Sequence, residues 1–135
     1  IMKGFSVFNT ALYQRSGGRF GGRFRKAPIL LLTTTGRRSG RPRTTPLLYL
    51  DDDGRTVIVA SYGGDDRAPQ WFRNLTADPE VTIQIGGRTR RMRAQVAEPD
   101  EKARLWPRLV EMYGDYAAYQ QQTSRDIPLV ILTES

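Results

Sequence analysis

A pair of strand-like runs on either side of a short basic turn limits the fold of this chain more than any other feature. Residues 28–35 and 43–50 are mostly apolar or β-branched, and a connection that contains Gly36 and Gly40 joins them. Runs of this kind, separated by a glycine-containing turn, form β-hairpins. We therefore expect an antiparallel sheet built outward from this hairpin.

The rest of the chain continues the same pattern. Further strands are expected at residues 56–61, 81–85, 88–96 and 128–133, with tight turns at 51–54 and 86–87. Apolar residues at helical spacing predict helices at 67–77, with Pro69 in the first turn, and at 100–113, where Pro107 should kink or restart the helix. These elements predict an α+β fold, mainly β, with about six antiparallel strands in a small barrel and peripheral helices.

The turn between the first two strands is densely basic. It contains four arginines and one hydroxyl residue but no carboxylate: Arg37, Arg38, Ser39, Arg41 and Arg43. Guanidinium groups bind phosphate and carboxylate oxygens with paired hydrogen bonds, and the turn glycines would let backbone N–H groups approach the same anion. This turn is predicted to bind an anion; the alternative is a solvated hairpin tip.

Charge and composition narrow the partner and the chemistry. The first fifty residues hold ten Lys and Arg residues and no Asp or Glu, and the whole chain has a net charge of +7. Such asymmetry indicates a polyanionic partner: a nucleic acid, an anionic membrane surface or a small molecule. Cysteine and histidine are both absent, which excludes disulfides, the usual zinc sites and imidazole catalysis. Since no apolar run could span a bilayer, we expect a soluble, cytoplasmic protein.

The N-terminal segment, residues 1–27, is predicted to be distinct from a single domain at 28–135. Residues 3–15 place Phe5, Phe8 and Leu12 on one helical face, with cations at both ends. This helix is expected either to pack on its own domain or to make a peripheral contact with the inner face of the plasma membrane. The tandem GGRF repeat that follows is expected to form a linker.

Polar and aromatic residues outside the basic turn form three further groups. A predicted strand is followed by Ser61, Tyr62, Gly63 and Gly64. In one interpretation this segment places a hydroxyl and backbone amides beside a flat ring; in the other it is an ordinary turn. Trp71 is either a core anchor or a wall of a cofactor or substrate pocket. Four arginines alternate between the faces of one strand, and we interpret them as charges that protect a solvated edge strand: Arg88, Arg90, Arg91 and Arg93.

Three tyrosines near the C-terminus are the remaining candidates. Tyr113 continues an apolar stripe and is expected in the core, whereas Tyr116 and Tyr119 are better placed to line a pocket. Their hydroxyls could donate hydrogen bonds to a developing oxyanion in a chain without histidine. Gly114 could break the helix between them.

The ordered motifs of the chain resemble those of a known family. The segments TTTGRRSGRPRTTPLLYL, VIVASYGG, APQWFRNLTADPEVTIQIGG, Tyr-x-x-Tyr-x-x-Tyr-Gln and IPLVIL are similar, in this order, to those of the deazaflavin-dependent nitroreductases. These are small oxidoreductases of mycobacteria and related actinobacteria that use coenzyme F420. The resemblance implies a split β-barrel like that of flavin-binding oxidases. It also implies hydride transfer from reduced F420 to a quinone, a nitroaromatic compound or another activated unsaturated acceptor.

The resemblance also assigns roles to individual residues. The phosphate and polyglutamate tail of the cofactor would be held by Arg37, Arg38, Ser39 and Arg43. Its ring system would be lined by Thr45, Pro46, Ala60, Ser61, Tyr62, Gly63 and Gly64. The acceptor site would be shaped by Trp71, Ser61, Tyr113, Tyr116 and Tyr119, with Ser61 and Tyr116 orienting the acceptor. Family members often have proline where this chain has Gly114, so the helix that follows is expected to sit or move differently.

Other interpretations stay open at this point. A non-catalytic protein that carries or senses F420, or FMN in its place, would use the same pocket. A small basic barrel that binds nucleic acid would explain the charge, but it predicts aromatic residues interleaved with cations along a sheet face, and this chain lacks that pattern. We expect no nucleic-acid partner, no metal, and a monomer or a weak homodimer.

Overall fold

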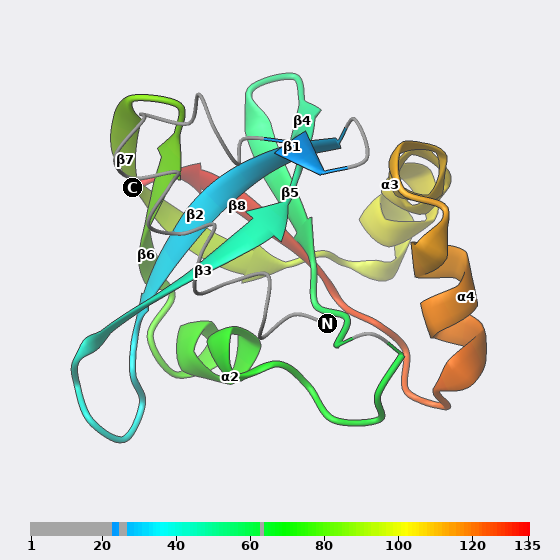
Figure 1. Cartoon of the computed structure of the whole chain (residues 1–135), viewed down its shortest axis with the longest axis horizontal. Helices are drawn as coiled ribbons and strands as arrows, with labels where there is room; N and C mark the ends of the chain where they lie inside the picture. Colours follow the sequence, from blue (N-terminus) through cyan, green and yellow to red (C-terminus); the bar gives the residue numbers. More distant parts are fainter. Residues whose placement is uncertain (1–22, 25–26, 63) are drawn as a thin grey trace.

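Residues 23–24, 27–62 and 64–135 are described here from a computed structural model (Figure 1), and the predicted helix at 3–15 lies outside them. The strands of this part are β1 (Arg23–Phe24), β2 (Ala27–Thr35), β3 (Pro42–Leu48), β4 (Leu50–Asp52), β5 (Arg55–Val59), β6 (Glu80–Ile85), β7 (Arg88–Val96) and β8 (Leu129–Glu134). The helices are α2 (Gln70–Ala77), α3 (Pro99–Met112) and α4 (Asp115–Gln122). The predicted α+β, mainly β class is confirmed.

The strands form one antiparallel sheet in the order β1-β2-β6-β7-β8-β5-β4, with β3 also paired to β2. The predicted hairpin is present, with Leu30 opposite Leu47 and Thr35 opposite Pro42. The β4–β5 hairpin turns at Asp53 and Gly54, both of which have positive φ, as a type I′ turn requires. Within the segment predicted as a linker, β1 pairs with the start of β2.

The predicted strand at 43–50 is two strands in the structure. β3 pairs with β2, whereas β4 pairs with β5, and Tyr49 lies between them. The backbone N–H of Tyr49 donates to the carbonyl of Pro28 at 3.2 Å. One continuous apolar run therefore changes partner at this residue and turns a corner of the barrel.

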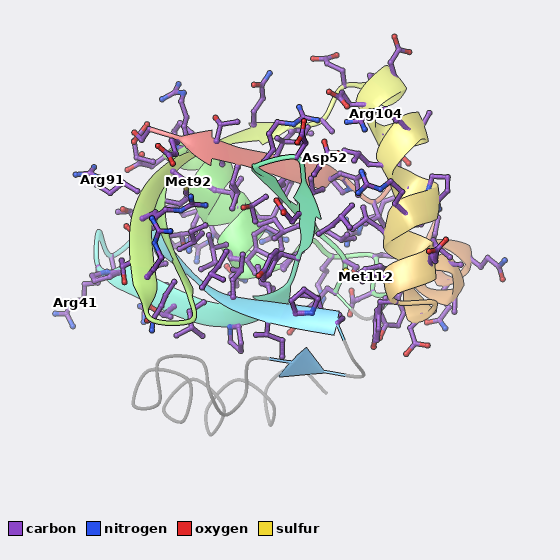
Figure 2. The ribbon with its side chains drawn as sticks, turned by 90° about the horizontal axis from the view of Figure 1, so that it is seen from above. Arg41, Asp52, Arg91, Met92, Arg104 and Met112 are labelled. Carbon is purple, nitrogen blue, oxygen red and sulfur yellow. The ribbon has the colours of Figure 1, made fainter. Side chains whose placement is uncertain are left out.

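The curled sheet encloses a packed interior, and the C-terminal helices α3 and α4 lie along one side of it (Figures 1 and 2). Along β5 and β8, side chains alternate between these two environments, as the pleat of a strand requires. Ile58, Val130 and Leu132 face the interior with Leu30, Ile83 and Met92. Val57, Val59, Leu129 and Ile131 pack outward against Leu105 and Leu109 of α3. Both faces of these two strands are therefore buried.

The arginine-rich strand β7 is an interior strand of the sheet where it meets both β6 and β8, so the predicted edge strand is wrong for this part, whereas in the described sheet residues 88–91 pair with β6 alone. It pairs with β6 on one side and with β8 on the other. Met92 and Ala94 are buried, whereas Arg91 and Arg93 on the opposite face are exposed. A charged outer face looks the same in the sequence at an edge or in the middle of a sheet, because backbone partners leave no mark in the side chains.

The helices begin and end close to the predicted positions. α2 starts at Gln70 rather than at residue 67, with Pro69 as its N-cap residue, and α3 continues through Pro107 to Met112 without restarting. The predicted break at Gly114 is confirmed, since Gly114 is the N-cap residue of α4. No helix in the described ranges is long and apolar enough to cross a membrane.

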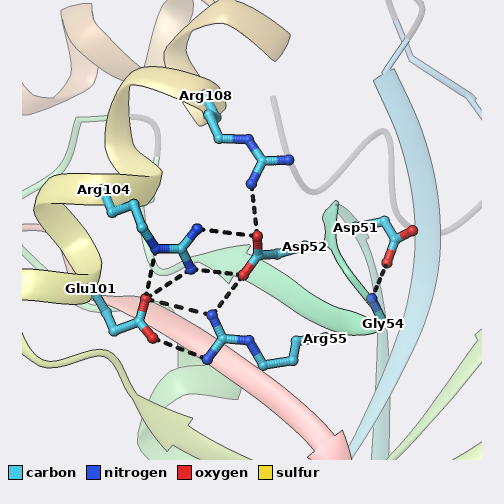
Figure 3. A network of polar contacts seen from close by, with 7 residues as sticks. All are labelled: Asp51, Asp52, Gly54, Arg55, Glu101, Arg104 and Arg108. Carbon is cyan, nitrogen blue, oxygen red and sulfur yellow. Dashed lines mark hydrogen bonds and ion pairs between the residues drawn. The ribbon is translucent and has the colours of Figure 1, made fainter.

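An ionic network fastens α3 to the β4–β5 hairpin (Figure 3). The carboxylate of Asp52 accepts hydrogen bonds from Arg55 at 2.6 Å, Arg104 at 2.8 Å and Arg108 at 2.7 Å. Glu101 pairs with Arg55 and Arg104. The side chain of Asp52 is only 8% exposed, so these partners supply the compensation that a buried charge needs. The network lies on the helical side of the barrel.

Candidate functional site

A cavity of about 720 Å³ opens between the basic turn, the end of β5 and helix α2. Figure 1 shows α2 across one end of the barrel, beside the long β2–β3 hairpin. The cavity brings together eight of the predicted site residues: Arg37, Arg38, Ser39, Arg43, Thr45, Ser61, Tyr62 and Trp71. Residues that are up to 34 positions apart in the sequence therefore share one cavity.

Other predicted residues lie elsewhere. Pro46 and Ala60 are buried and do not line the cavity, and neither does Gly64. Gly63 lies outside the described residues. Arg41 belongs to the same turn, but its side chain points away from the body of the protein (Figure 2) and does not line the cavity. The cavity is therefore lined by part of the basic turn and not by all of it.

Helix α2 holds the basic turn in place. The Oδ1 atom of Asn74 accepts hydrogen bonds from the backbone N–H of Arg37 at 3.2 Å and from its Nη1 at 3.0 Å. Arg37 Nη1 also donates to Gln70 Oε1 at 2.8 Å. On its other side, Asn74 Nδ2 donates to Thr34 Oγ1 at 3.2 Å, within the barrel. The turn is thus braced against both β2 and α2.

The backbone amides of the basic turn are mostly engaged within the protein. Gly36 N–H donates to the carbonyl of Arg41, Gly40 N–H donates to the carbonyl of Gly36, and Arg41 N–H donates to Ser39 Oγ. Gly40 has a φ of 71°, which glycine adopts without strain. The expectation that the turn glycines present their amides to an anion is therefore not met.

The cavity is strongly cationic. Its lining holds five arginines and no Asp or Glu: Arg37, Arg38, Arg43, Arg67 and Arg73. Within the described part of the chain, only Arg67 of these five forms an ion pair, with Asp65 at 3.0 Å. Uncompensated guanidiniums that converge on one cavity favour a ligand with several negative charges.

The segment after β5 forms the opposite wall. Ser61 and Tyr62 are partly buried and line the cavity. The guanidinium of Arg67 lies 5.8 Å from the centre of the Tyr62 ring, within cation–π range. Its hydrogen bonds to Asp65 lower the pKa of that carboxyl to about 2, so Asp65 is ionised at neutral pH. Asp65 thereby holds Arg67 at the rim of the cavity.

Trp71 is both a core residue and part of the cavity wall, and its contact with a cofactor or substrate stays a prediction. It is 7% exposed and belongs to the barrel core, and it also lines the cavity. Its ring meets Phe72 edge to face at 6.2 Å. Trp71 therefore anchors α2 and gives the cavity an aromatic surface.

The three tyrosines form a cluster of their own. The rings of Tyr113 and Tyr116 are 4.9 Å apart, and the hydroxyls of Tyr113 and Tyr119 lie within 3.2 Å of each other. Tyr116, expected to face a pocket, is 5% exposed and packs with Leu105 and Leu109. Burial raises the pKa of Tyr113 and of Tyr116, so both keep their protons at neutral pH. None of the three lines the cavity as described, and their catalytic role stays a prediction.

Sequence reasoning found Trp71 but missed the other lining residues of α2 and of the loop before it. Arg67, Gln70, Arg73 and Asn74 line the cavity beside Trp71. A signal was present, because Asn74 lies three residues after Trp71 and therefore on the same helical face. The described residues contain no cluster of acidic side chains that could hold a metal ion.

A curled antiparallel sheet with outer helices, closed into a barrel, defines the split-barrel class of fold, and here a basic cavity with an aromatic wall opens at one end of it. A solved structure of a candidate pyridoxamine 5′-phosphate oxidase from Listeria innocua shares this fold, with a TM-score of 0.55 at 15% identity over 78% of this chain and 82% of that chain. At this level of identity, the likeness concerns the fold alone.

The family is shown by sequence. The family model described as F420H(2)-dependent quinone reductase matches residues 6–134, and the chain belongs to this family. An F420H(2)-dependent quinone reductase of Mycobacterium tuberculosis is 44% identical over 127 residues, which cover 91% of this chain and 85% of that protein. The predicted resemblance, cofactor and reductase activity are thereby confirmed.

Two solved structures support the same assignment. One, described as an F420-H2 dependent reductase (FDR-A), has a TM-score of 0.73 at 40% identity and covers 78% of this chain and 94% of its own. The other is described as a domain-swapped dimer and has a TM-score of 0.75 at 36% identity, with 92% of each chain covered. The fold and the family therefore agree.

Proposed function

We propose that this protein binds reduced F420 in the cavity between the basic turn and α2 and passes its hydride to a quinone. The observation that carries the proposal is the convergence of five arginines, without a lining carboxylate, on one cavity that also has an aromatic wall. This donor set suits a cofactor that combines a flat ring with a polyanionic tail. Nitroaromatic compounds and other activated unsaturated molecules are further acceptors under this proposal.

The tail of the cofactor would lie along the basic turn. Arg37, Arg38, Arg43 and the Ser39 hydroxyl would bind its phosphate and carboxylates, as predicted from the sequence. Arg73 of α2 adds a fifth donor group across the cavity. Guanidinium donors make charge-assisted hydrogen bonds, which are roughly twice as strong as neutral ones.

The ring of the cofactor would lie against the wall formed by Thr45, Ser61, Tyr62 and Trp71, with Pro46, Ala60 and Gly64 behind this wall; a ring contact of Gly63 stays a prediction. Reduced F420 supplies the hydride. The protein has to bind, orient and exclude water, because hydride transfer needs the reacting atoms about 3–3.5 Å apart. The Ser61 hydroxyl would donate to the acceptor oxygen on which charge builds.

The tyrosines Tyr113, Tyr116 and Tyr119 are proposed to shape the acceptor site. Because burial raises the pKa of Tyr116 and of Tyr113, these residues can act as neutral hydroxyl donors but not as bases at neutral pH. The tyrosines also pack against α3. They could therefore affect the acceptor site indirectly, by fixing the position of α4, instead of by touching the acceptor.

A binding experiment distinguishes this proposal from an FMN-binding protein and from a nucleic-acid-binding protein. Purified protein is titrated with F420, with FMN and with a short oligonucleotide, and cofactor fluorescence or oligonucleotide anisotropy is recorded. Saturable binding of F420 alone supports the proposal, whereas oligonucleotide binding without F420 binding contradicts it. Turnover of menadione by protein loaded with reduced F420 then distinguishes a reductase from a carrier.

Substitutions test the catalytic residues. Ser61→Ala and Tyr116→Phe should each lower kcat with menadione and with a nitroaromatic acceptor. Ser135→Ala is a control, since its hydroxyl bonds Glu80 at the chain end and lies outside the cavity lining. Full turnover in both test variants would remove these two residues from the mechanism.

A homodimer is the proposed oligomeric state, supported by the domain-swapped dimer among the related structures. Light scattering after size-exclusion chromatography, over a range of protein concentrations, tests it. A single monomeric mass at all concentrations would contradict it.

A further inference from the structure

Arg125 lies between α4 and β8, outside the cavity, and reaches the segment that forms one cavity wall. Its Nη2 donates to the carbonyl of Ala60 at 2.9 Å, and its Nε donates to the carbonyl of Asp65 at 3.3 Å. These carbonyls flank Ser61 and Tyr62. One guanidinium therefore spans both ends of the short loop that carries them.

The position of Arg125 is itself fixed by α4 and the residues after it. Its carbonyl accepts from Gln120 Nε2 at 2.8 Å, and its backbone N–H donates to Thr123 Oγ1 at 3.3 Å. The Thr123 hydroxyl in turn donates to Asp66 Oδ1 at 2.5 Å. The end of α4 and the cavity loop are thus joined by three side-chain bonds to residues 60–66.

Among the described residues of this loop, 60–62 and 64–66, backbone hydrogen bonds are few. Asp65 N–H donates to the carbonyl of Tyr62 at 3.0 Å, and Ala60 N–H donates to Pro128. Gly64 has a φ of 83°, and a Cβ at this position would collide with the side chain of Gln122 in α4. A segment of this kind takes its conformation from external partners, and Arg125 supplies two of them.

We propose that Arg125 is a positioning residue that fixes the Ser61–Tyr62 wall of the cofactor cavity and couples this wall to helix α4, which carries Tyr116 and Tyr119. The proposal rests on the proposed function of that cavity. It gives the tyrosine helix a physical connection to the site without contact between the tyrosine rings and the cavity.

Two substitutions and a matched control test the proposal. Arg125→Met removes all donors and keeps an apolar stem, while Arg125→Lys keeps one cation that cannot reproduce the planar fork. Arg104→Met removes a guanidinium that bonds two acceptor residues, Asp52 and Glu101, away from the cavity. F420 affinity is measured by fluorescence titration, turnover by menadione reduction, and loop order by hydrogen exchange of residues 60–66.

The expected result is specific to the loop. Arg125→Met should speed amide exchange in residues 60–66 and lower kcat/KM by about ten- to a hundredfold, because small displacements of positioning groups are costly. Arg125→Lys should fall between Arg125→Met and the unmodified protein, and Arg104→Met should leave F420 affinity and loop exchange unchanged. In the double variant with Ser61→Ala, the combined loss should be smaller than the product of the single losses.

The proposal is overturned if loop exchange and F420 affinity in Arg125→Met match those of the unmodified protein, or if Arg104→Met produces the same changes. Should Arg125→Met fail to fold, the same comparison is decided by Arg125→Lys. Absence of F420 binding to the unmodified protein would instead contradict the proposed function. The exchange measurement would still report whether Arg125 orders the loop.

Discussion

One oxygen atom of Asn74 accepts hydrogen bonds from two different groups of Arg37. The Asn74 Oδ1 atom accepts from the backbone and from the guanidinium of Arg37, at 3.2 and 3.0 Å. Asn74 is 4% exposed, and its amide group donates to Thr34, which is also buried. The position of Arg37 in the basic turn is therefore set from helix α2.

Replacing Asn74 by alanine should weaken F420 binding and destabilise the fold. The change leaves the Thr34 hydroxyl and an Arg37 N–H without their partners, which costs about 1–3 kcal/mol. We expect roughly a tenfold rise in the Kd for F420, which corresponds to about 1.4 kcal/mol. Fluorescence titration and urea unfolding measure the two effects. Thr76→Ala, at an exposed position of the same helix, should change neither; an unchanged Kd in Asn74→Ala would contradict the bracing role.

Arg43→Gln should reduce both the affinity for F420 and its dependence on salt. Arg43 lines the cavity, and no ion pair with another described residue compensates its charge. Loss of one charge-assisted contact should raise the Kd by roughly ten- to a hundredfold, since such bonds contribute about 1.5–3 kcal/mol. Titrations at several salt concentrations test this. Arg88→Gln, which is exposed and does not line the cavity, should behave like the unmodified protein, and equal effects of the two changes would argue for a nonspecific charge effect.

Acid should destabilise the protein through Asp52. Hydrogen bonds from Arg104 and then Arg55 lower the pKa of this carboxyl below its ordinary 3.8 in the folded state. The resulting stabilisation is fully present above the ordinary pKa and is lost as the pH falls through that value toward the lower folded pKa. Asp52→Asn should remove this pH-dependent part and cost roughly 1.5–3 kcal/mol at neutral pH.

Urea unfolding between pH 7 and pH 3 measures the effect of Asp52→Asn. Asp53→Asn is the matched control, because Asp53 is exposed and its positive φ tolerates asparagine. Glu101 keeps part of the acid sensitivity in the variant, since its pKa is also lowered by Arg55 and Arg104. Parallel stability curves for Asp52→Asn and the unmodified protein would contradict the prediction.

Gly64→Ala should be destabilising, whereas Gly87→Ala should not. Gly64 has a φ of 83°, and an added Cβ would meet the side chain of Gln122. The left-handed conformation alone costs a non-glycine residue about 1–2 kcal/mol. A Cβ at Gly87 meets open space, so that change should be neutral or slightly stabilising. Urea midpoints of the two variants test the contrast, and equal midpoints would show that the loop adapts to the extra carbon.

Most of the elements were predictable because their signals are local. Alternating apolar residues, the Asp53-Gly54 turn and the Gly86-Gly87 turn act over a few residues, and they predicted the strands β2, β5, β6, β7 and β8 within two residues of their ends. The position of β7 between β6 and β8 was not predictable in this way. Strand order depends on pairing between distant segments, and the charge pattern of one strand does not encode it.

The candidate site was predictable only in part. Glycines, arginines and a hydroxyl crowded into one turn predicted an anion site at residues 36–43, because charge density is visible in the sequence. The family resemblance then selected Arg37, Arg38, Ser39 and Arg43 within this turn. The role of Asn74 could not be predicted, because it depends on the contacts of this side chain with Arg37 and Thr34, which are distant in the sequence. The same reason applies to Arg125, whose two acceptors lie 60 or more residues away in the chain.

The sequence by itself determined a mainly β chain with an acid-free, arginine-rich first third, and hence a protein suited to a polyanionic ligand. Only the tertiary structure decided which arginines share a cavity, that Arg41 points away from it, and that Tyr116 packs into the core instead of lining it. Composition and local spacing fix which groups are present and which elements they form. The curvature of the sheet and the packing of α2 and α4 on it fix which of those groups meet.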